Sequence, residues 1–297
     1  MSEYVNCNMC PRECGVDRRY KLGACKASDK IKVALASIHN FEEPCISGKN
    51  GSGTVFFSNC NLRCVYCQNF KISRDGFGKE ISVQRLADIF LEQQARGVNN
   101  INLVTPTMYI ESIIKAIKIA KENGLNIPIV YNSSGYEKVE MIKKLEGYID
   151  IYLPDFKYAT NRLSTKYSGV NNYVESALAS IEEMIKQVGK PVFDNNGIMK
   201  KGVIIRHMIL PNNVLNSKMV LKKIAEKFKN NVLVSVMAQY FPSGDAIKYP
   251  EINRKISKEE LKEIEDYLID LNIENGYIQE LGEHEEEYVP LFDLSNT

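Results

Sequence analysis

The chain has almost no net charge, no long apolar run and no recognisable secretion signal. It carries 38 Lys and Arg residues against 37 Asp and Glu residues, a net charge of +1. No global electrostatic field therefore recruits nucleic acid or an anionic membrane. No uninterrupted apolar run is long enough to cross a bilayer. The stretch from Met1 to Cys7 shows no basic region followed by an apolar one, so we expect a cytoplasmic protein with no nucleic-acid or membrane partner.

Cysteine, in contrast, is abundant, with eight residues in a chain of 297. Without a secretion signal, this number indicates metal ligation in a reducing compartment rather than disulfides. Hydrophobic residues make up 44% and charged residues 25%, which is an ordinary balance for a globular protein. The length suits one large α/β domain with a small appendage.

From residue 54 onward, strand-like runs alternate with helical patterns. The expected strands cover residues 54–58, 101–105, 127–132, 149–153, 203–209 and 232–237. The expected amphipathic helices cover residues 82–96, 109–123, 137–146, 173–188, 213–229 and 257–271. Six such units predict an α/β fold, a partial (βα)6 TIM-type barrel over residues 51–297, with 276–281 as a further edge strand. Residues 1–50 hold five of the cysteines and form a separate module, and the charged run 283–287 is expected to be a solvated tail.

Three cysteines, Cys60, Cys64 and Cys67, follow the first expected strand with the spacing C-x3-C-x2-C. Three thiolates can hold three irons of a 4Fe–4S cluster and leave the fourth iron open to a cofactor. Unligated buried thiols, or a zinc loop completed by a distant ligand, are the alternatives. Active sites of α/β proteins lie at strand ends, which favours the cluster. The motif resembles the signature of radical S-adenosylmethionine (SAM) enzymes, in which the open iron binds the amino and carboxylate groups of SAM. Tyr66 is expected to shield the cluster from water.

Charged residues at the ends of later strands are candidates for SAM binding. Asp155 and Lys157 alternate along an extended segment, so their side chains share one face and can meet a zwitterion. This pair is similar to the Asp-x-Lys motif of pyruvate formate-lyase activating enzyme, and a surface ion pair is the alternative. Arg206 lies within an apolar strand and matches a family arginine that approaches the SAM carboxylate. His207 points to the opposite face and is expected to be structural.

Polar residues complete the expected cofactor site. Thr105 ends the second expected strand, where the family usually has a Gly-Gly-Glu run that is absent here. The resemblance therefore implies only backbone contacts with SAM at this position. A simple turn, with Thr107 as a helix cap, is the alternative. Asn132 and Ser134 resemble the ribose-binding strand end of glycyl-radical-enzyme activases, or cap the next helix. Gln239 ends the sixth strand within reach of adenosine or substrate. Further candidates for the substrate side, with surface roles as the alternative, are His39, Glu42 and Glu43.

Four cysteines near the N-terminus form a second set: Cys7, Cys10, Cys14 and Cys25. The turn at Cys10-Pro-Arg-Glu-Cys14-Gly resembles a zinc knuckle, and four local thiolates make a closed structural site. They could equally hold a second 4Fe–4S cluster, because spacing alone does not choose between the two. Cys45 stands apart and is expected to be a free thiol.

Taken together, these motifs resemble an uncharacterised branch of the radical SAM superfamily related to pyruvate formate-lyase activating enzyme. The resemblance implies an anaerobic oxidoreductase with a 4Fe–4S cluster and SAM, which cleaves SAM reductively and abstracts a hydrogen atom. It further implies a flavodoxin- or ferredoxin-type reductant and a glycyl radical enzyme or other protein as substrate. Six units also leave a lateral gap that could admit a polypeptide loop. A small-molecule substrate, or an iron–sulfur electron carrier without catalysis, stays open as an alternative.

Overall fold

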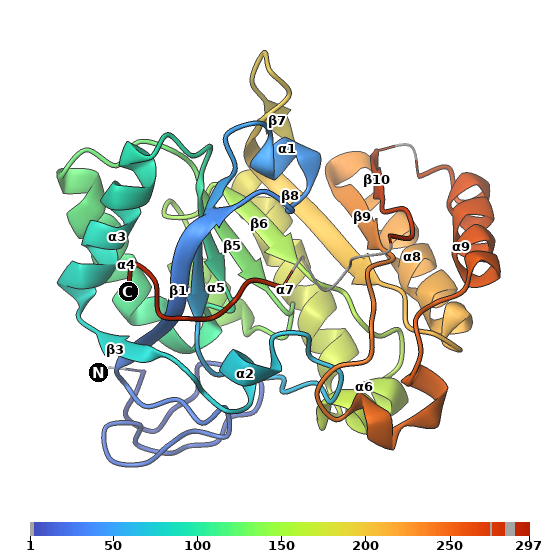
Figure 1. Ribbon diagram of the computed structural model, residues 1–297, viewed down its shortest axis with the longest axis horizontal. Helices are drawn as coiled ribbons and strands as arrows, with labels where there is room; N and C mark the ends of the chain where they lie inside the picture. The colour runs from blue at the N-terminus through green and yellow to red at the C-terminus, as the bar shows by residue number, and fades with distance from the viewer. Residues whose placement is uncertain (1–2, 274, 283–288) are drawn as a thin grey trace.

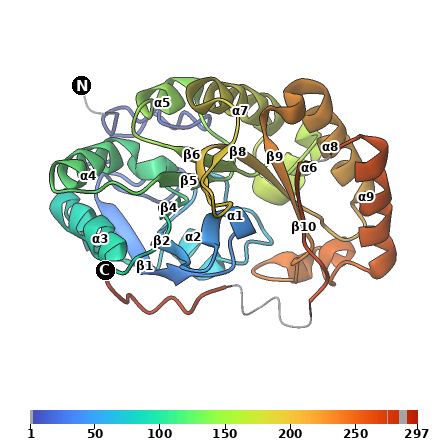
Figure 2. The ribbon, with the colours of Figure 1, turned by 90° about the horizontal axis from the view of Figure 1, so that it is seen from above.

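The computed structural model describes residues 3–273, 275–282 and 289–297, which fold into one curved, mostly parallel sheet with helices on its outer face (Figures 1 and 2). The parallel strands, in their order across the sheet, are β2 (Ser52–Phe57), β4 (Ile101–Val104), β5 (Ile129–Ser133), β6 (Ile151–Pro154), β8 (Met199–Met208), β9 (Leu233–Met237) and β10 (Gly276–Ile278). Two strands extend the β2 edge in antiparallel pairing, β1 (Ile31–His39) and then β3 (Lys79–Ile81). The order runs from β10 to β3, so this partial barrel stays open between those two edges.

Helices follow most of the parallel strands and cover the outside of the sheet. The long ones are α3 (Val83–Ala95), α4 (Ile110–Glu122), α7 (Tyr173–Val188), α8 (Val214–Phe228) and α9 (Lys258–Asp270). The shorter ones are α1 (Pro44–Ser47), α2 (Phe70–Ser73), α5 (Val139–Lys144) and α6 (Asn161–Ser168). Side-chain caps begin two of them: Ser82 accepts a hydrogen bond from the Arg85 amide at α3, and Ser257 forms a capping box with Glu260 at α9.

The predicted partial barrel is confirmed, and each expected strand and helix is present with its ends shifted by a few residues. The edge strand expected at 276–281 is β10, which pairs in parallel with β9. The sequence did not predict β1, α6 or the short β7 (Val192–Phe193), which pairs with β8. β1 lies within the first 50 residues but pairs with β2, so the sheet begins before the expected boundary. The charged run 283–287 lies outside the described residues.

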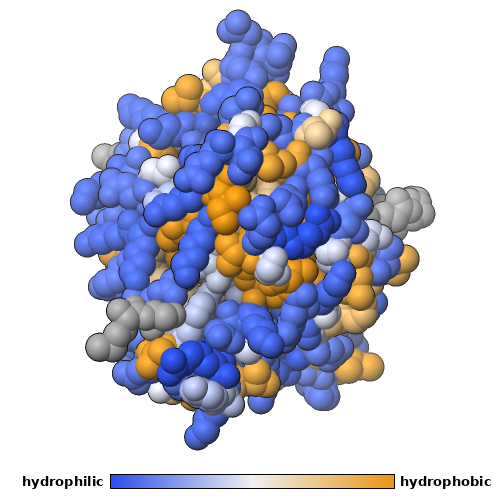
Figure 3. Space-filling model, turned by 90° about the vertical axis from the view of Figure 1, so that its left-hand side faces the viewer, coloured by the Kyte–Doolittle hydropathy of each residue, from blue (hydrophilic) through white to orange (hydrophobic). Residues whose placement is uncertain are grey.

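The inside of the barrel is apolar at one end and polar at the other. Val130, Ile151, Leu153 and Ile204 pack together with Cys45 and Ile46 of α1, which closes the end where the parallel strands begin. α2 and α6 lie at the opposite end, where the strands finish (Figure 1). The outer face on the α3 and α4 side is mostly hydrophilic, with an apolar area near its middle (Figure 3). None of the described helices is both long and apolar enough to span a membrane.

Candidate functional site

A cavity of about 470 Å³ opens inside the barrel at the carboxyl ends of the parallel strands. It contains every residue that the sequence predicted around the cluster and SAM: Cys60, Cys64, Tyr66, Cys67, Thr105, Asn132, Ser134, Asp155, Lys157, Arg206 and Gln239. His39, Glu42 and Glu43 also line it, so they face the cavity rather than the surface. The fold therefore brings side chains from seven different segments to one place.

The three cysteines of the loop 60–67, called here the cluster loop, are free thiols on one wall of this cavity. Each sulfur accepts a hydrogen bond. The Ser168 hydroxyl donates to Cys64 Sγ over 3.0 Å, and the Ser73 hydroxyl donates to Cys67 Sγ over 3.2 Å. The Leu62 amide lies 3.4 Å from Cys60 Sγ. Donors aimed at sulfur favour thiolates, which are the form that ligates metal.

Burial opposes the thiolate form in the cluster loop as long as no metal is bound. Burial, and then repulsion from the Cys64 thiolate, raises the pKa of the Cys60 thiol to about 12. Metal ions reverse such a shift because a bound cation displaces the proton. No three His, Cys, Asp or Glu side chains of the described chain are arranged around a single metal ion. The ligands of a cluster each bind a different iron, so they need not converge on one point.

Tyr66 is nearly inaccessible to solvent and lies between aromatic neighbours. Its hydroxyl shares a hydrogen bond of 2.7 Å with the Tyr158 hydroxyl, which in turn lies 2.7 Å from the Ser168 hydroxyl. Its ring meets Tyr167 and Tyr240 edge to face. This chain of contacts ends at the Cys64 sulfur through Ser168. Tyr66 is thus placed to exclude water from the cluster loop.

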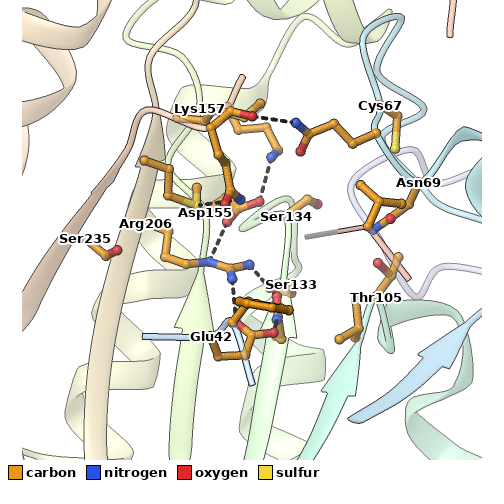
Figure 4. Close-up of a pocket in the computed structure, with 18 of the residues that line it drawn as sticks. Glu42, Cys67, Asn69, Thr105, Ser133, Ser134, Asp155, Lys157, Arg206 and Ser235 are labelled. Atoms are coloured by element: carbon orange, nitrogen blue, oxygen red, sulfur yellow. Dashed lines mark hydrogen bonds and ion pairs between the residues drawn. The ribbon is translucent and has the colours of Figure 1, made fainter. Parts of the chain in front are cut away.

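Opposite the cluster loop, Arg206 joins three acceptors (Figure 4). Its Nε donates to Asp155 Oδ1 over 3.0 Å, and its terminal nitrogens donate to Glu42 Oε2 over 3.1 Å and to Asn132 Oδ1 over 2.5 Å. Lys157 Nζ lies 2.5 Å from Asp155 Oδ2. Asp155 therefore connects the two cations, and the predicted pair is not exposed, because its side chains are only 14% and 15% accessible.

The charges in this network act on one another at low solvent exposure. Although burial raises the pKa of the Asp155 carboxyl, Lys157 and Arg206 hold the pKa below its ordinary value. Burial lowers the pKa of Lys157, but Asp155 more than offsets this and the pKa is raised. Burial raises the pKa of Glu42 and Glu43, with Arg206 acting against it. Glu43 Oε2 is buried without a hydrogen-bond partner, which leaves an acceptor for a bound molecule.

Three residues in the turns that carry lining residues of the cavity have a strained backbone. Asn59, Arg63 and Thr105 have left-handed φ angles of 72°, 60° and 59°. Such conformations are costly for residues other than glycine, above all for a β-branched threonine, and they cluster at functional sites. Gly135 supports the same region, since a Cβ there would lie 2.3 Å from the Asp155 carbonyl oxygen. The turns after β2, β4 and β5 are therefore specific conformations rather than generic connections.

Two interpretations of single residues are settled by their contacts. Thr107 does not cap α4: its hydroxyl donates to Glu137 Oε1 over 2.6 Å, and the α4 N-cap is Tyr109, without a side-chain cap. His207 is fully buried, as expected for a structural residue. Its ring nitrogens lie 2.8 Å from the Phe156 carbonyl and 2.8 Å from the Ser217 hydroxyl.

Sequence reasoning missed the hydroxyl donors of the cluster loop. Ser168 is 104 residues from Cys64 in the chain, and no local pattern marks it. Ser73 follows Cys67 by six residues on α2, but a serine in a short helix is unremarkable in sequence. The N-terminal cysteines line a second, small cavity apart from the first, and Cys45 is a free, buried thiol separate from both sets.

Comparison with known proteins identifies the family. A model of the radical SAM superfamily matches residues 54–201. An uncharacterized protein of Methanocaldococcus jannaschii is 32% identical over 282 residues, which cover 90% of this chain and 77% of that protein. A pyruvate formate-lyase-activating enzyme of Clostridium pasteurianum is 27% identical over 259 residues, which cover 80% of this chain and 99% of that enzyme.

Solved structures share the fold at low identity. A radical SAM methyltransferase from Sphaerobacter thermophilus has a TM-score of 0.54 at 14% identity, covering 76% of this chain and 65% of that one. Streptococcus suis SuiB bound to the precursor peptide SuiA has a TM-score of 0.50 at 17% identity, and the match covers 74% of this chain and 46% of SuiB. The chain thus spans less than two thirds of these solved chains. In radical SAM proteins a 4Fe–4S cluster and SAM are the implied cofactors, and this chain belongs to the radical SAM superfamily.

Proposed function

We propose that this protein cleaves SAM reductively at a 4Fe–4S cluster on Cys60, Cys64 and Cys67 and abstracts a hydrogen atom from a glycine Cα of a partner protein. The observation that carries the proposal is that one cavity holds both the cluster loop and the network of Asp155, Lys157 and Arg206. An iron–sulfur electron carrier would need the cluster loop but not the charged network. The loaded cluster would supply the electron that splits SAM into methionine and a 5′-deoxyadenosyl radical.

The protein's own residues bind and orient SAM. Asp155 and Lys157 lie next to each other, so an ammonium and a carboxylate of one zwitterion can contact them together. Arg206 uses three of its five N–H donors on protein acceptors, so it both holds Asp155 in place and keeps donors for a carboxylate. Asn132 and Ser134 would take the ribose hydroxyls, and Thr105 would offer backbone groups.

A protein substrate is supported by the size and the openness of the site. The cavity, about 470 Å³, lies at the lower end of the roughly 300–1,000 Å³ of small-molecule sites. A nucleoside joined to an amino acid would fill much of it, so a substrate would approach from outside. The barrel is open between β10 and β3, and the N-terminal segment that carries four of the cysteines lies on another side, near α4 and α5 (Figure 2).

The names of two similar proteins also support a protein substrate. The matching protein of Clostridium pasteurianum is named as an activating enzyme for pyruvate formate-lyase, and SuiB was solved with a precursor peptide. Two carboxyl groups, Glu42 and Glu43, lie in the cavity beside Arg206 and favour a small polar substrate as the second candidate. In either case we infer an anaerobic cytoplasmic enzyme, reduced by a flavodoxin- or ferredoxin-type protein.

The test is anaerobic incubation of reduced, reconstituted enzyme with SAM and candidate glycyl radical enzymes. We expect 5′-deoxyadenosine and methionine, together with a glycyl radical doublet by electron paramagnetic resonance. The Cys60/Cys64/Cys67→Ala triple variant is the control and should form neither product. SAM cleavage by that variant would contradict the cluster assignment. Cleavage by wild type with no protein radical, but with deuterium transfer from a small metabolite, would replace the protein substrate with a small molecule.

A further inference from the structure

Residues 3–30, called here the cysteine segment, fold without any helix or strand. The segment contains turns, bends and irregular chain, yet it buries Cys7 and Cys25 to 6% exposure and half-buries Cys10 and Cys14. None of the four is in a disulfide. A segment of this size without regular structure normally needs a metal or a cross-link to hold one conformation.

The four cysteines lie around one small enclosed cavity. Tight turns present them: the Glu13 amide donates to the Cys10 carbonyl over 3.0 Å, and the Gly15 amide donates to the Cys7 carbonyl over 3.0 Å. Gly23 leaves room between two of the sulfurs. A Cβ at Gly23 would lie 3.1 Å from Cys25 Sγ and 3.7 Å from Cys14 Sγ. A side chain there would intrude on the space that the thiols surround.

Arg12, between Cys10 and Cys14, extends from this segment to the cluster loop. Its Nε donates to the Asn61 carbonyl, and a terminal nitrogen donates to the Leu62 carbonyl over 3.1 Å. Both carbonyls belong to residues between Cys60 and Cys64.

The same guanidinium also contacts the end of α6. It donates to the carbonyls of Ser168 and Gly169 over 3.2 and 3.3 Å. The Ser168 hydroxyl is the donor to Cys64 Sγ. In the other direction, Arg63 of the cluster loop donates to the Ala24 carbonyl of the cysteine segment over 3.5 Å. Arg12 thus joins the cysteine segment to the cluster loop and to the end of α6, whose Ser168 contacts the Cys64 sulfur.

We propose that Cys7, Cys10, Cys14 and Cys25 bind a thiolate-ligated metal centre of their own, and that this centre holds Arg12 where it orders the cluster loop. The four thiols supply the soft sulfur ligands that a zinc ion or a second iron–sulfur cluster needs. No three of them surround a single ion position as they stand, so a zinc ion would draw the sulfurs together, whereas the ligands of a cluster each bind a different iron. Arg12 is a positioning residue, because it contacts the backbone of the cluster loop and not the sulfurs. The second half of the proposal rests on the proposed function of Cys60, Cys64 and Cys67, whereas the first half does not.

Metal analysis of the Cys60/Cys64/Cys67→Ala variant tests the first half with the N-terminal cysteines intact. We expect one centre per chain: about one zinc, or about four iron with equal sulfide. Adding Cys7→Ser and Cys25→Ser to the same variant should remove that metal. A triple variant without bound metal after anaerobic purification and reconstitution would overturn the proposal, whatever the activity of the wild type.

Hydrogen–deuterium exchange of the cluster-loop peptide tests the second half. In metal-loaded wild-type background, Arg12→Ala should speed exchange there roughly tenfold, as expected for losing charge-assisted hydrogen bonds. The matched control is Arg19→Ala, because Arg19 pairs with Asp17 on the exposed side of the same segment. Arg12→Ala should keep its N-terminal metal, and peptides of α3 should exchange as in wild type.

Selective removal of the N-terminal metal from wild type completes the test. Metal removal should speed exchange of the cluster-loop peptide about as much as Arg12→Ala does. Removing the metal from the Arg12→Ala variant should speed exchange little further. Unchanged exchange in Arg12→Ala would refute the role of Arg12. A clear effect of Arg12→Ala with no effect of metal removal would refute the link between the metal and Arg12.

Discussion

Lys157 offers the cleanest test of how this protein recognises SAM. Its Nζ contacts Asp155, but Asp155 also accepts from Arg206 Nε over 3.0 Å. Lys157→Ala therefore leaves the buried carboxylate with a cationic partner. The loss in unfolding free energy should stay below the roughly 3–5 kcal/mol expected when a buried charge is left alone.

The effect on SAM binding should be larger than the effect on folding. A charge-assisted hydrogen bond contributes about 1.5–3 kcal/mol, and each 1.4 kcal/mol changes an affinity tenfold. Lys157→Ala should thus weaken SAM binding roughly 10- to 100-fold. The pKa of Asp155 should rise in the variant, because one of the two cations that lower it is gone.

Calorimetric titration of SAM into anaerobically reconstituted protein measures the effect, with iron and sulfide content determined on the same samples. Lys200→Ala is the matched control, because Lys200 also pairs with an aspartate, Asp194, at 3.1 Å, but on the exposed surface. The control should bind SAM as wild type does. Unchanged affinity in Lys157→Ala, with a full complement of iron, would refute the assignment of Lys157 to the SAM site.

Three further predictions concern the fold around the cavity. Arg206→Ala should lower the unfolding free energy by about 3–5 kcal/mol in chemical denaturation, because it leaves buried carboxylates unpaired, and a loss below 1 kcal/mol would contradict the network. Gly135→Ala should destabilise the protein by at least about 2 kcal/mol, since its Cβ meets the Asp155 carbonyl, whereas Gly147→Ala, with open space around it, should cost only about 1 kcal/mol. Burial raises the pKa of Glu137 to about 8, so its contribution to stability is complete below pH 4.5 and is lost as the pH rises to about 8. In chemical denaturation across this pH range, the free energy of unfolding of Glu137→Gln should rise by up to about 4 kcal/mol relative to that of wild type as the pH increases. A difference between the two proteins that does not change with pH would disprove the raised pKa.

The elements of the barrel could be predicted because their signals are local. Strands such as 101–105 and helices such as 109–123 show their period within a few turns of chain, and β4 and α4 were found within a few residues of those limits. β1 was missed because Ile31–His39 follows a cysteine-rich stretch and pairs with β2, a partner that no local pattern names. A capping role for Thr107 was the alternative because this residue precedes a helix, but its hydroxyl donates to Glu137, 30 residues away.

The sequence by itself determined the cysteine spacing of the cluster loop and the order of its strand and helix units, and with them the family. It also placed Asp155 and Lys157 on one face, because side chains two apart in extended chain point the same way. Only the tertiary structure decided that Glu42 reaches Arg206, that Ser168 donates to Cys64, and that Arg12 holds the carbonyls of the cluster loop. The physical reason is that periodicity and spacing act between neighbours in the chain, whereas these contacts join distant residues. Ser168 and Cys64 are 104 residues apart, Glu42 and Arg206 are 164 apart, and Arg12 lies 49 and 50 residues from Asn61 and Leu62. Contacts at such separations depend on how the whole sheet curves and which loops meet at its open end.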